Sequence, residues 1–192
     1  LMFKDKIFGN QIIDPASYVS SKATLIGAII IEKDVIIAPG ACLRADEGTP
    51  FKICKGTNIQ DGVKMHGLLD RFVEVEGKQY SIYIGSHCSI AHAALIHGPS
   101  KIGKKTFVGF RTTIHNSVVG RNCYIGFHVV INGVNVADNR YVPDGMIVNC
   151  QEIADSLQAI TAEAKHFNKE VVDYNKKLIT LYQDRRKMKN EG

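Results

Sequence analysis

The sequence predicts a mainly β protein, a left-handed parallel β-helix of hexapeptide repeats with a C-terminal α-helix packed along the outside. Two observations lead to this fold. Aliphatic residues return at every sixth position over most of the chain, and a helical spacing of apolar residues replaces them after Cys150. We therefore expect residues 1–150 to form a β-helix domain and residues 151–192 a helical segment that packs on it.

The six-residue spacing is clearest in the middle of the chain. Six aliphatic residues follow one another at this step: Ile84, Ile90, Ile96, Ile102, Val108 and Ile114. Because Ile, Leu and Val together make up roughly one residue in five, such a run arises by chance about once in ten thousand. Each hexapeptide is expected to form one side of a triangular coil, with three sides and roughly 18 residues per turn. Residues 19 to about 149 then give roughly six or seven turns, whereas a β-sandwich would alternate with period two.

The end of the chain carries a helical pattern. Apolar residues at steps of four and three form a stripe there: Phe167, Val171, Tyr174, Leu178 and Leu181. This spacing predicts a helix from about 162 to 188 that buries the stripe against the coil.

Composition excludes several classes of protein. The 192 residues are 45% hydrophobic and 22% charged, which is typical of a globular domain. No apolar run is long enough for a membrane span, and no signal peptide is expected. The net charge of +5 lies mainly in the C-terminal helix, where a solvated face is expected instead of a nucleic-acid surface. Five widely spaced cysteines without a CxxC pair indicate reduced thiols and a cytoplasmic location.

Two interruptions of the repeat fix its register. The surplus residues after Leu43 and after Met65 are expected to form loops that project from the coil. The same side of successive turns is then anchored by Leu43, Met65, Ile96 and Ile114. The residues that follow these anchors form a vertical ladder, which reads Arg44, His66, His97 and His115.

The ladder indicates that one chain supplies only some of the ligands of a metal site. His66 and His97 are neighbours in it, while His92 stacks on Asp61 along an adjacent side of the triangle. Three neutral imidazoles with one position left for water are the ligands of a hydrolytic or hydrating zinc site. Because His92 lies on another side, we expect it to serve a neighbouring subunit. A closed threefold assembly, a homotrimer, would contain three such sites.

The motifs around these residues resemble the gamma-class carbonic anhydrases and their carboxysome-associated relatives. They are Arg44-Ala45-Asp46-Glu47-Gly48, Asn58-Ile59-Gln60-Asp61-Gly62, Ala91-His92 and His97-Gly98-Pro99. The similarity runs from about residue 10 to Ala154 and resumes over 166–172. It implies a lyase that reversibly hydrates CO2 to bicarbonate with a metal-bound hydroxide at a trimer interface. The cofactor implied is Zn2+, with Fe2+ or Co2+ as other possible metals.

The resemblance also implies roles for individual residues. His66 and His97 of one chain and His92 of its neighbour would bind the metal. Arg44 and Asp61 would form an ion pair across the interface, for which the guanidinium fork is suited.

Four more residues match the catalytic and substrate-binding positions of these enzymes. Gln60 and Asn58 would hydrogen-bond the bound hydroxide or bicarbonate, and Asn168 would contact bicarbonate. Glu47 would handle the proton of the bound water.

The chain departs from this pattern after His66. Leu69 stands where the archetypal enzyme has a proton-shuttling glutamate, so Asp70, Glu47 or another group must substitute, or turnover is limited. The ladder adds His115 as a candidate proton relay. Two alternatives therefore remain: a catalytically weak or inactive scaffold or binding protein, and a hexapeptide acyltransferase with a histidine as general base.

Overall fold

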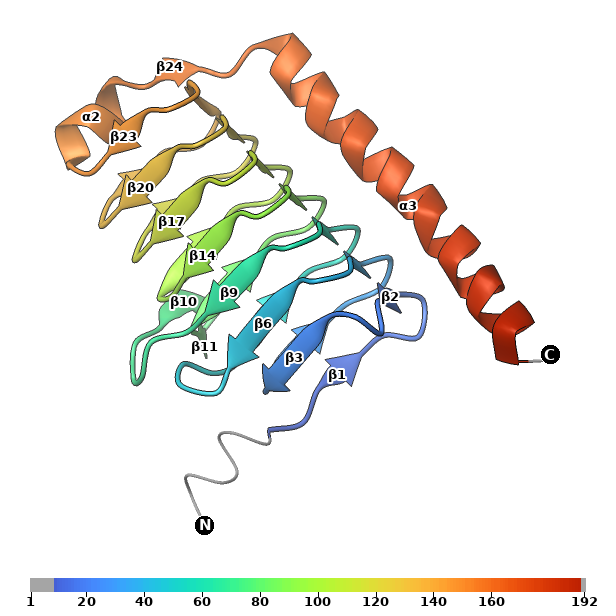
Figure 1. Cartoon of the computed structure of the whole chain (residues 1–192). Coiled ribbons are helices and arrows are strands. Elements are labelled where there is room, and N and C mark those ends of the chain that lie inside the picture. Colours follow the sequence, from blue (N-terminus) through green and yellow to red (C-terminus); the bar gives the residue numbers. More distant parts are fainter. Residues whose placement is uncertain (1–8, 191–192) are drawn as a thin grey trace.

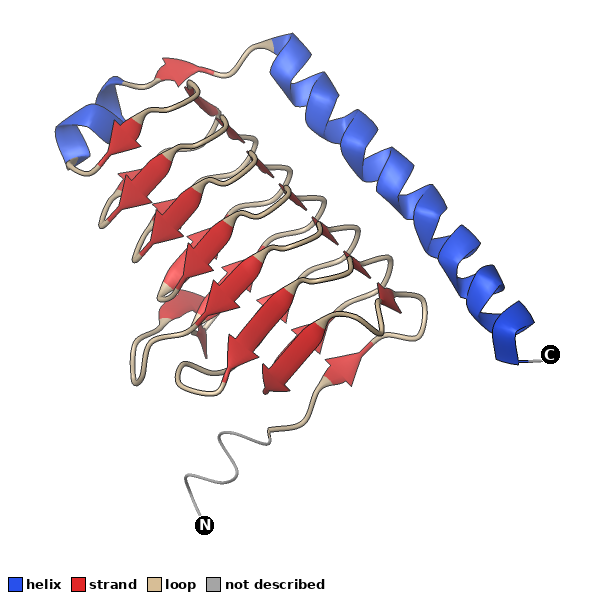
Figure 2. Ribbon diagram, in the orientation of Figure 1, coloured by secondary structure: helices blue, strands red, loops and turns tan. Residues whose placement is uncertain are grey.

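The computed structural model describes residues 9–190 and shows a left-handed parallel β-helix with a long helix beside it (Figure 1). Within this range, three parallel sheets form the sides of seven stacked triangular coils (Figure 2). The predicted fold class is confirmed, and the coil number agrees with the repeat count. The outer bounds of the two predicted domains, residues 1 and 192, lie outside the described range.

The sheets are named A, B and C in the order in which the chain meets them. Sheet A contains β1 (Ile12–Ile13), β4 (Ile29–Ile31), β7 (Phe51–Ile53), β12 (Ile82–Ile84), β15 (Ser100–Ile102), β18 (Val118–Val119) and β21 (Asn135–Val136). Sheet B contains β2 (Tyr18–Val19), β5 (Ile36–Ile37), β8 (Asn58–Ile59), β13 (Ser89–Ile90), β16 (Phe107–Val108), β19 (Tyr124–Ile125), β22 (Arg140–Val142) and the antiparallel β24 (Gln158–Ala159). Sheet C contains β3 (Thr24–Gly27), β6 (Cys42–Ala45), β9 (Lys64–His66), β14 (Leu95–His97), β17 (Thr113–His115), β20 (Val130–Asn132) and β23 (Ile147–Val148).

The aliphatic anchors fill the interior of the coil. All six members of the central run, from Ile84 to Ile114, have no exposed surface. Their burial removes apolar area from water on every turn and fixes which side chains point outward. Cys88 also lies inside, where burial raises the pKa of its thiol to about 12. All five cysteines are free, as the sequence predicts.

The predicted register is confirmed on sheet C. Met65 pairs with Leu43 on one side and with Ile96 on the other, and Ile96 pairs with Ile114. Both surplus segments project from the coil. The second one carries a hairpin of β10 (Val73–Val75) and β11 (Lys78–Tyr80), which is labelled beside β9 and β6 in Figure 1.

The chain ends with a short helix, α2 (Gln151–Ser156), and a long one, α3 (Ala162–Asn190), which runs along the outside of the coil (Figure 1). The position of α3 agrees with the prediction, although it continues two residues further. It packs against the side formed by sheet B. Among residues 9–190, no helix has the combination of length and apolar character that a membrane crossing requires.

The prediction that the apolar stripe of α3 is buried against the coil is wrong in part. Phe167, Tyr174 and Leu181 are 39%, 64% and 62% exposed, respectively. Over residues 162–185, the buried residues of α3 are Ala164, Asn168, Val172 and Ile179. Apart from Asn168 these residues are small or aliphatic, and they also recur at helical spacing. The helix therefore has two adjacent stripes, and the one with smaller side chains lets it approach the coil more closely. Phe167, Tyr174 and Leu181 remain exposed in a single chain, whereas Val171 and Leu178 are half-buried.

Candidate metal centre

Three imidazoles stack along the outer face of sheet C. His66, His97 and His115 end β9, β14 and β17, and they pair directly with one another in the strand register. The ring centroids of His66 and His97 are 5.3 Å apart, and those of His97 and His115 are 5.2 Å apart. The interior anchors force these side chains outward because successive residues of a strand point to opposite faces.

His66 has a ring nitrogen without a hydrogen-bond partner. Its Nε2 atom is buried, and the nearest acidic oxygens are Asp46 Oδ1 at 3.6 Å and Glu47 Oε2 at 3.9 Å. Asp46 Oδ1 is likewise buried without a partner. Unpaired buried polar atoms are unfavourable, so this corner of the coil is suited to a bound cation.

His97 and His92 are each held through Nδ1. His97 Nδ1 lies 2.9 Å from the carbonyl oxygen of Gly98, and His92 Nδ1 lies 2.5 Å from Asp61 Oδ1. Since both partners are acceptors, Nδ1 donates and Nε2 is left as the nitrogen with a free lone pair. A histidine that donates its other ring N–H to a carboxylate or carbonyl is the usual arrangement at metal sites.

Arg44 organises the loop beside His66. Its Nε and Nη2 atoms donate to Asp46 Oδ2 at 3.1 and 2.8 Å. Burial by itself raises the pKa of Asp46, but the hydrogen bonds from Arg44 and from the backbone outweigh it and lower the pKa. The carboxylate therefore stays charged beside His66. Within one chain Arg44 pairs with Asp46 and Asp61 pairs with His92. The ion pair expected between Arg44 and Asp61 would join two copies of the chain, so it stays a prediction.

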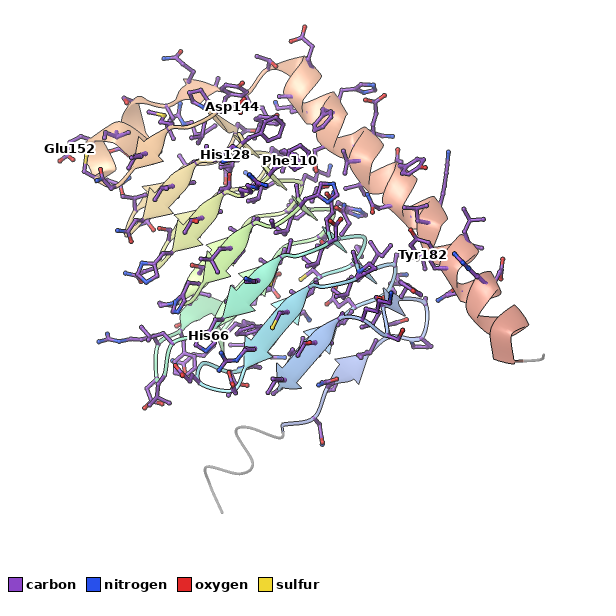
Figure 3. The ribbon with its side chains drawn as sticks, viewed as in Figure 1. His66, Phe110, His128, Asp144, Glu152 and Tyr182 are labelled. Atoms are coloured by element: carbon purple, nitrogen blue, oxygen red, sulfur yellow. The ribbon has the colours of Figure 1, made fainter. Side chains whose placement is uncertain are left out.

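His92 lies far from the other two histidines. It stands at the corner between sheets B and C, with Asp61, while His97 lies at the opposite end of the same side of the coil. The five-residue step from His92 to His97 corresponds to more than about 10 Å. Figure 3 shows His66 on the far side of the coil from Tyr182 of α3, a residue that lines the pocket of His92. Within the part of the chain that the structure describes, no three potential ligands gather around one point.

Gln60 lies beside His92 in a pocket of about 340 Å³. Its Nε2 donates to Asn58 Oδ1 at 2.9 Å, and Asn58 Nδ2 donates to Ser89 Oγ at 2.9 Å. Asn58 therefore links two coils and orients Gln60. The Oε1 atom of Gln60 is buried and has no hydrogen-bond partner, so it is available to a ligand.

The structure does not bring Asn168 to this pocket. Asn168 lies at the corner between sheets A and B, where its Nδ2 donates to the backbone oxygen of His87 at 3.2 Å. The helix residues that line the pocket with Gln60 and His92 include Tyr174 and Asn175. No sequence motif predicts that Asn175 lies beside Gln60, since its position in the pocket depends on how α3 is rotated about its axis.

The remaining candidates lie around the ladder. Leu69 is on the projecting segment after His66 and is 52% exposed. Asp70 follows it in the left-handed region, with φ of 53°. His115 Nδ1 lies 2.7 Å from Asn132 Oδ1, which orients its ring next to His97.

The fold and the repeats define a hexapeptide-repeat β-helix protein. The family model "Bacterial transferase hexapeptide (six repeats)" matches residues 99–133. Among solved structures, the chain superposes on a hexapeptide transferase family protein from Anaplasma phagocytophilum with a TM-score of 0.72 and 20% identity, covering 90% of this chain and 92% of that one. A putative acetyltransferase from Bacillus cereus gives a TM-score of 0.70 at 16% identity, over 91% and 92% of the two chains. At these identities the likeness shows the fold alone.

Relatives found by sequence resemble this chain more closely than these solved structures do. The chain is 38% identical over 118 residues to the carbonic anhydrase of Methanosarcina thermophila, a match covering 56% of this chain and 48% of that protein. It is 49% identical over 108 residues to the carboxysome assembly protein CcmM of a Nostoc species, covering 56% of this chain and 20% of that protein. The resemblance seen in the motifs is thereby confirmed. The chain matches about half, or less, of the length of these relatives.

Proposed function

We propose that this chain is a metal-dependent carbonic anhydrase that assembles as a homotrimer. His66 and His97 of one copy and His92 of the next would hold the metal. The observation that carries the proposal is the separation of the proposed ligands. Two neighbouring imidazoles, those of His66 and His97, lie at one end of a coil side, and the imidazole of His92 lies at the other end. A threefold arrangement of copies joins such halves into three equal sites.

The residues present fit a divalent ion. Three neutral imidazole nitrogens suit zinc, and iron or cobalt would also accept them. The buried, unpaired Nε2 of His66 is the structural sign of this fit. When bound, the ion would activate a water molecule for attack on CO2.

The residues of the chain would supply the rest of the chemistry. Glu47 places a carboxylate 3.9 Å from His66 Nε2 with 54% of its side chain exposed, so it can take a proton at the site and release it to solvent. Gln60 would orient the substrate, because its Nε2 is already engaged by Asn58 and its free Oε1 can accept a hydrogen bond from the hydroxyl of bicarbonate. The structure favours Asn175 over Asn168 as the helix amide beside Gln60.

The test combines metal analysis of anaerobically purified protein with stopped-flow CO2 hydration. We expect about one metal ion per chain and measurable hydration. His66→Ala should lose both, whereas His128→Ala, which changes an exposed histidine on another coil, should lose neither. Absence of metal from the unmodified protein, together with absence of hydration, would refute the proposal.

A catalytically weak scaffold is the second candidate. Leu69 cannot carry a proton, and one of the relatives is named as a carboxysome assembly protein. Stoichiometric metal without CO2 hydration would favour this reading. The acyltransferase alternative has support from the fold alone, at 20% identity or below, and would require turnover of acetyl-CoA without metal. The cytoplasmic location expected from the sequence stays a prediction.

A further inference from the structure

A second pocket lies under the first half of α3, away from the histidine ladder. It has a volume of about 420 Å³, within the range of small-molecule sites. Its lining residues come from the corner between sheets A and B and from the helix: His87, Lys105, Asn122, Lys165, Asn168, Lys169, Val172 and Asp173.

The floor of this pocket is built by one turn position repeated on three coils. His87, Lys105 and Asn122 occupy it on successive coils, with φ of 57°, 59° and 52°. Gly56 holds the same position one coil below His87, and a Cβ atom there would lie 2.4 Å from His87 Nδ1. The glycine therefore makes room for the imidazole ring, which is fixed in place at the floor.

The charge of the pocket is positive. Lys105, Lys165 and Lys169 line it against one carboxylate, Asp173, whose Oδ2 lies 2.5 Å from Lys169 Nζ. Burial lowers the pKa of His87, and the surrounding ammonium groups, among them Lys105, lower it further. Two ammonium groups thus remain without a carboxylate among the residues that line the pocket, which favours an anion.

Asn168 adds a specific, unsatisfied hydrogen-bonding group. The residue is 4% exposed, and its Nδ2 is engaged by the backbone oxygen of His87. Its Oδ1 is buried and has no hydrogen-bond partner. A buried acceptor of this kind is costly unless a donor reaches it, and the pocket is the space from which a ligand could supply one.

We propose that this pocket binds a small metabolite that carries a phosphate group and a hydroxyl or amino donor. The phosphate would lie among Lys105, Lys165 and Lys169, since lysine is a common phosphate ligand and several ammonium groups match a double negative charge. The donor would reach Asn168 Oδ1, and the apolar wall at Val172 would face the carbon skeleton. Asn168 lines this pocket and not the one beside Gln60, and none of the three lysines belongs to the proposed metal centre, so this site is independent of the proposed function.

Isothermal titration of the full chain tests the proposal with three probes: glucose 6-phosphate, inorganic phosphate and glucose. We expect the two phosphates to bind, glucose 6-phosphate more tightly, and glucose not to bind. Lys105→Gln should weaken both phosphates by about fivefold or more. Lys78→Gln, which removes the same charge from the distant β11, is the matched control and should bind like the unmodified protein.

A second variant tests the role of the buried amide. Asn168→Leu should remove the advantage of glucose 6-phosphate over inorganic phosphate while leaving inorganic phosphate binding unchanged. The proposal is overturned if neither phosphate binds at about 10 mM. It is equally overturned if Lys78→Gln weakens binding as much as Lys105→Gln, because binding would then follow only the net charge. Equal affinity of the two phosphates in the unmodified protein would refute the donor contact to Asn168.

Discussion

At the scale of single residues, Asp61 determines how His92 is presented. Its carboxylate accepts the Nδ1 proton of His92 at 2.5 Å, which leaves Nε2 as the nitrogen that would bind the proposed metal. Asp61→Asn should lower zinc affinity by about 10- to 100-fold. Competition with a chromophoric chelator measures this change. Asp138→Asn is the control because Asp138 pairs with Arg121 at another corner of the coil, and zinc affinity equal in the two variants would contradict the prediction.

Glu47 is expected to carry the proton from the proposed metal centre to solvent. It is the exposed carboxylate nearest to His66 that is not engaged by Arg44. Glu47→Gln should lower kcat for CO2 hydration by about 100-fold, with a smaller effect on KM, because the change removes proton transfer and leaves substrate binding. A small buffer such as imidazole should restore part of the rate. Glu74→Gln on β10 serves as the control, and a Glu47→Gln enzyme with unchanged kcat would show that another group carries the proton.

The limits of sequence reasoning are visible at this same scale. The stacking of His66 on His97 could be predicted because a six-residue period fixes which side chains neighbour each other on adjacent coils. The approach of Asp46 to His66 could not, since it depends on the conformation of a loop outside the repeat. The position of Asn175 in the pocket of Gln60 could not be predicted for a related reason: which helix residue faces Gln60 is set by the rotation of α3.

At the scale of elements, the coil and α3 differ in how strongly the sequence specifies them. Every strand of the central coil contributes an aliphatic side chain to the interior, so a shift of one residue would expose the whole set. The helix has two adjacent apolar stripes, and its spacing alone does not say which stripe the coil covers. In the structure the stripe of Ala164, Val172 and Ile179 is buried against the coil, whereas Tyr174 and Leu181 are exposed.

This choice can be tested on α3. Ile179 is 4% exposed, so Ile179→Ala should lower the free energy of unfolding by about 2–4 kcal/mol through loss of buried side-chain volume. Thr180→Ala, at the next and exposed position, should change it by less than about 0.5 kcal/mol. Urea denaturation of both variants gives the comparison. Equal stability of the two would mean that α3 does not pack on the coil as described.

At the scale of the whole molecule, the proposed division of the metal ligands between two ends of a coil side would make activity depend on assembly. One chain presents His66 and His97 at one end of a coil side and His92 at the other, with no complete ligand set among residues 9–190. The exposed stripe of α3, together with Phe110 stacked on Phe127 near His92, leaves apolar surface beside that ligand for a second copy. A proposed site of this kind would form and disappear with the oligomer.

Two inactive variants should therefore restore each other. His66→Ala and His92→Ala each remove a ligand from every site of a uniform trimer, so each alone should bind no metal in the centre and lack CO2 hydration. When the two are unfolded together in equal amounts and refolded, a site is complete wherever an intact His66 meets an intact His92 of the neighbouring copy. Random assembly gives this in about a quarter of the sites. Metal content and hydration should both return to about that fraction.

His66→Ala mixed with His97→Ala is the matched control. Both changes fall on the same half of the site, so no combination of chains completes it, and activity should stay absent. Recovery in the control would mean that His66 and His97 of a site come from different chains, and no recovery in the first mixture would mean that all three histidines act within one chain. Either result would refute the shared arrangement.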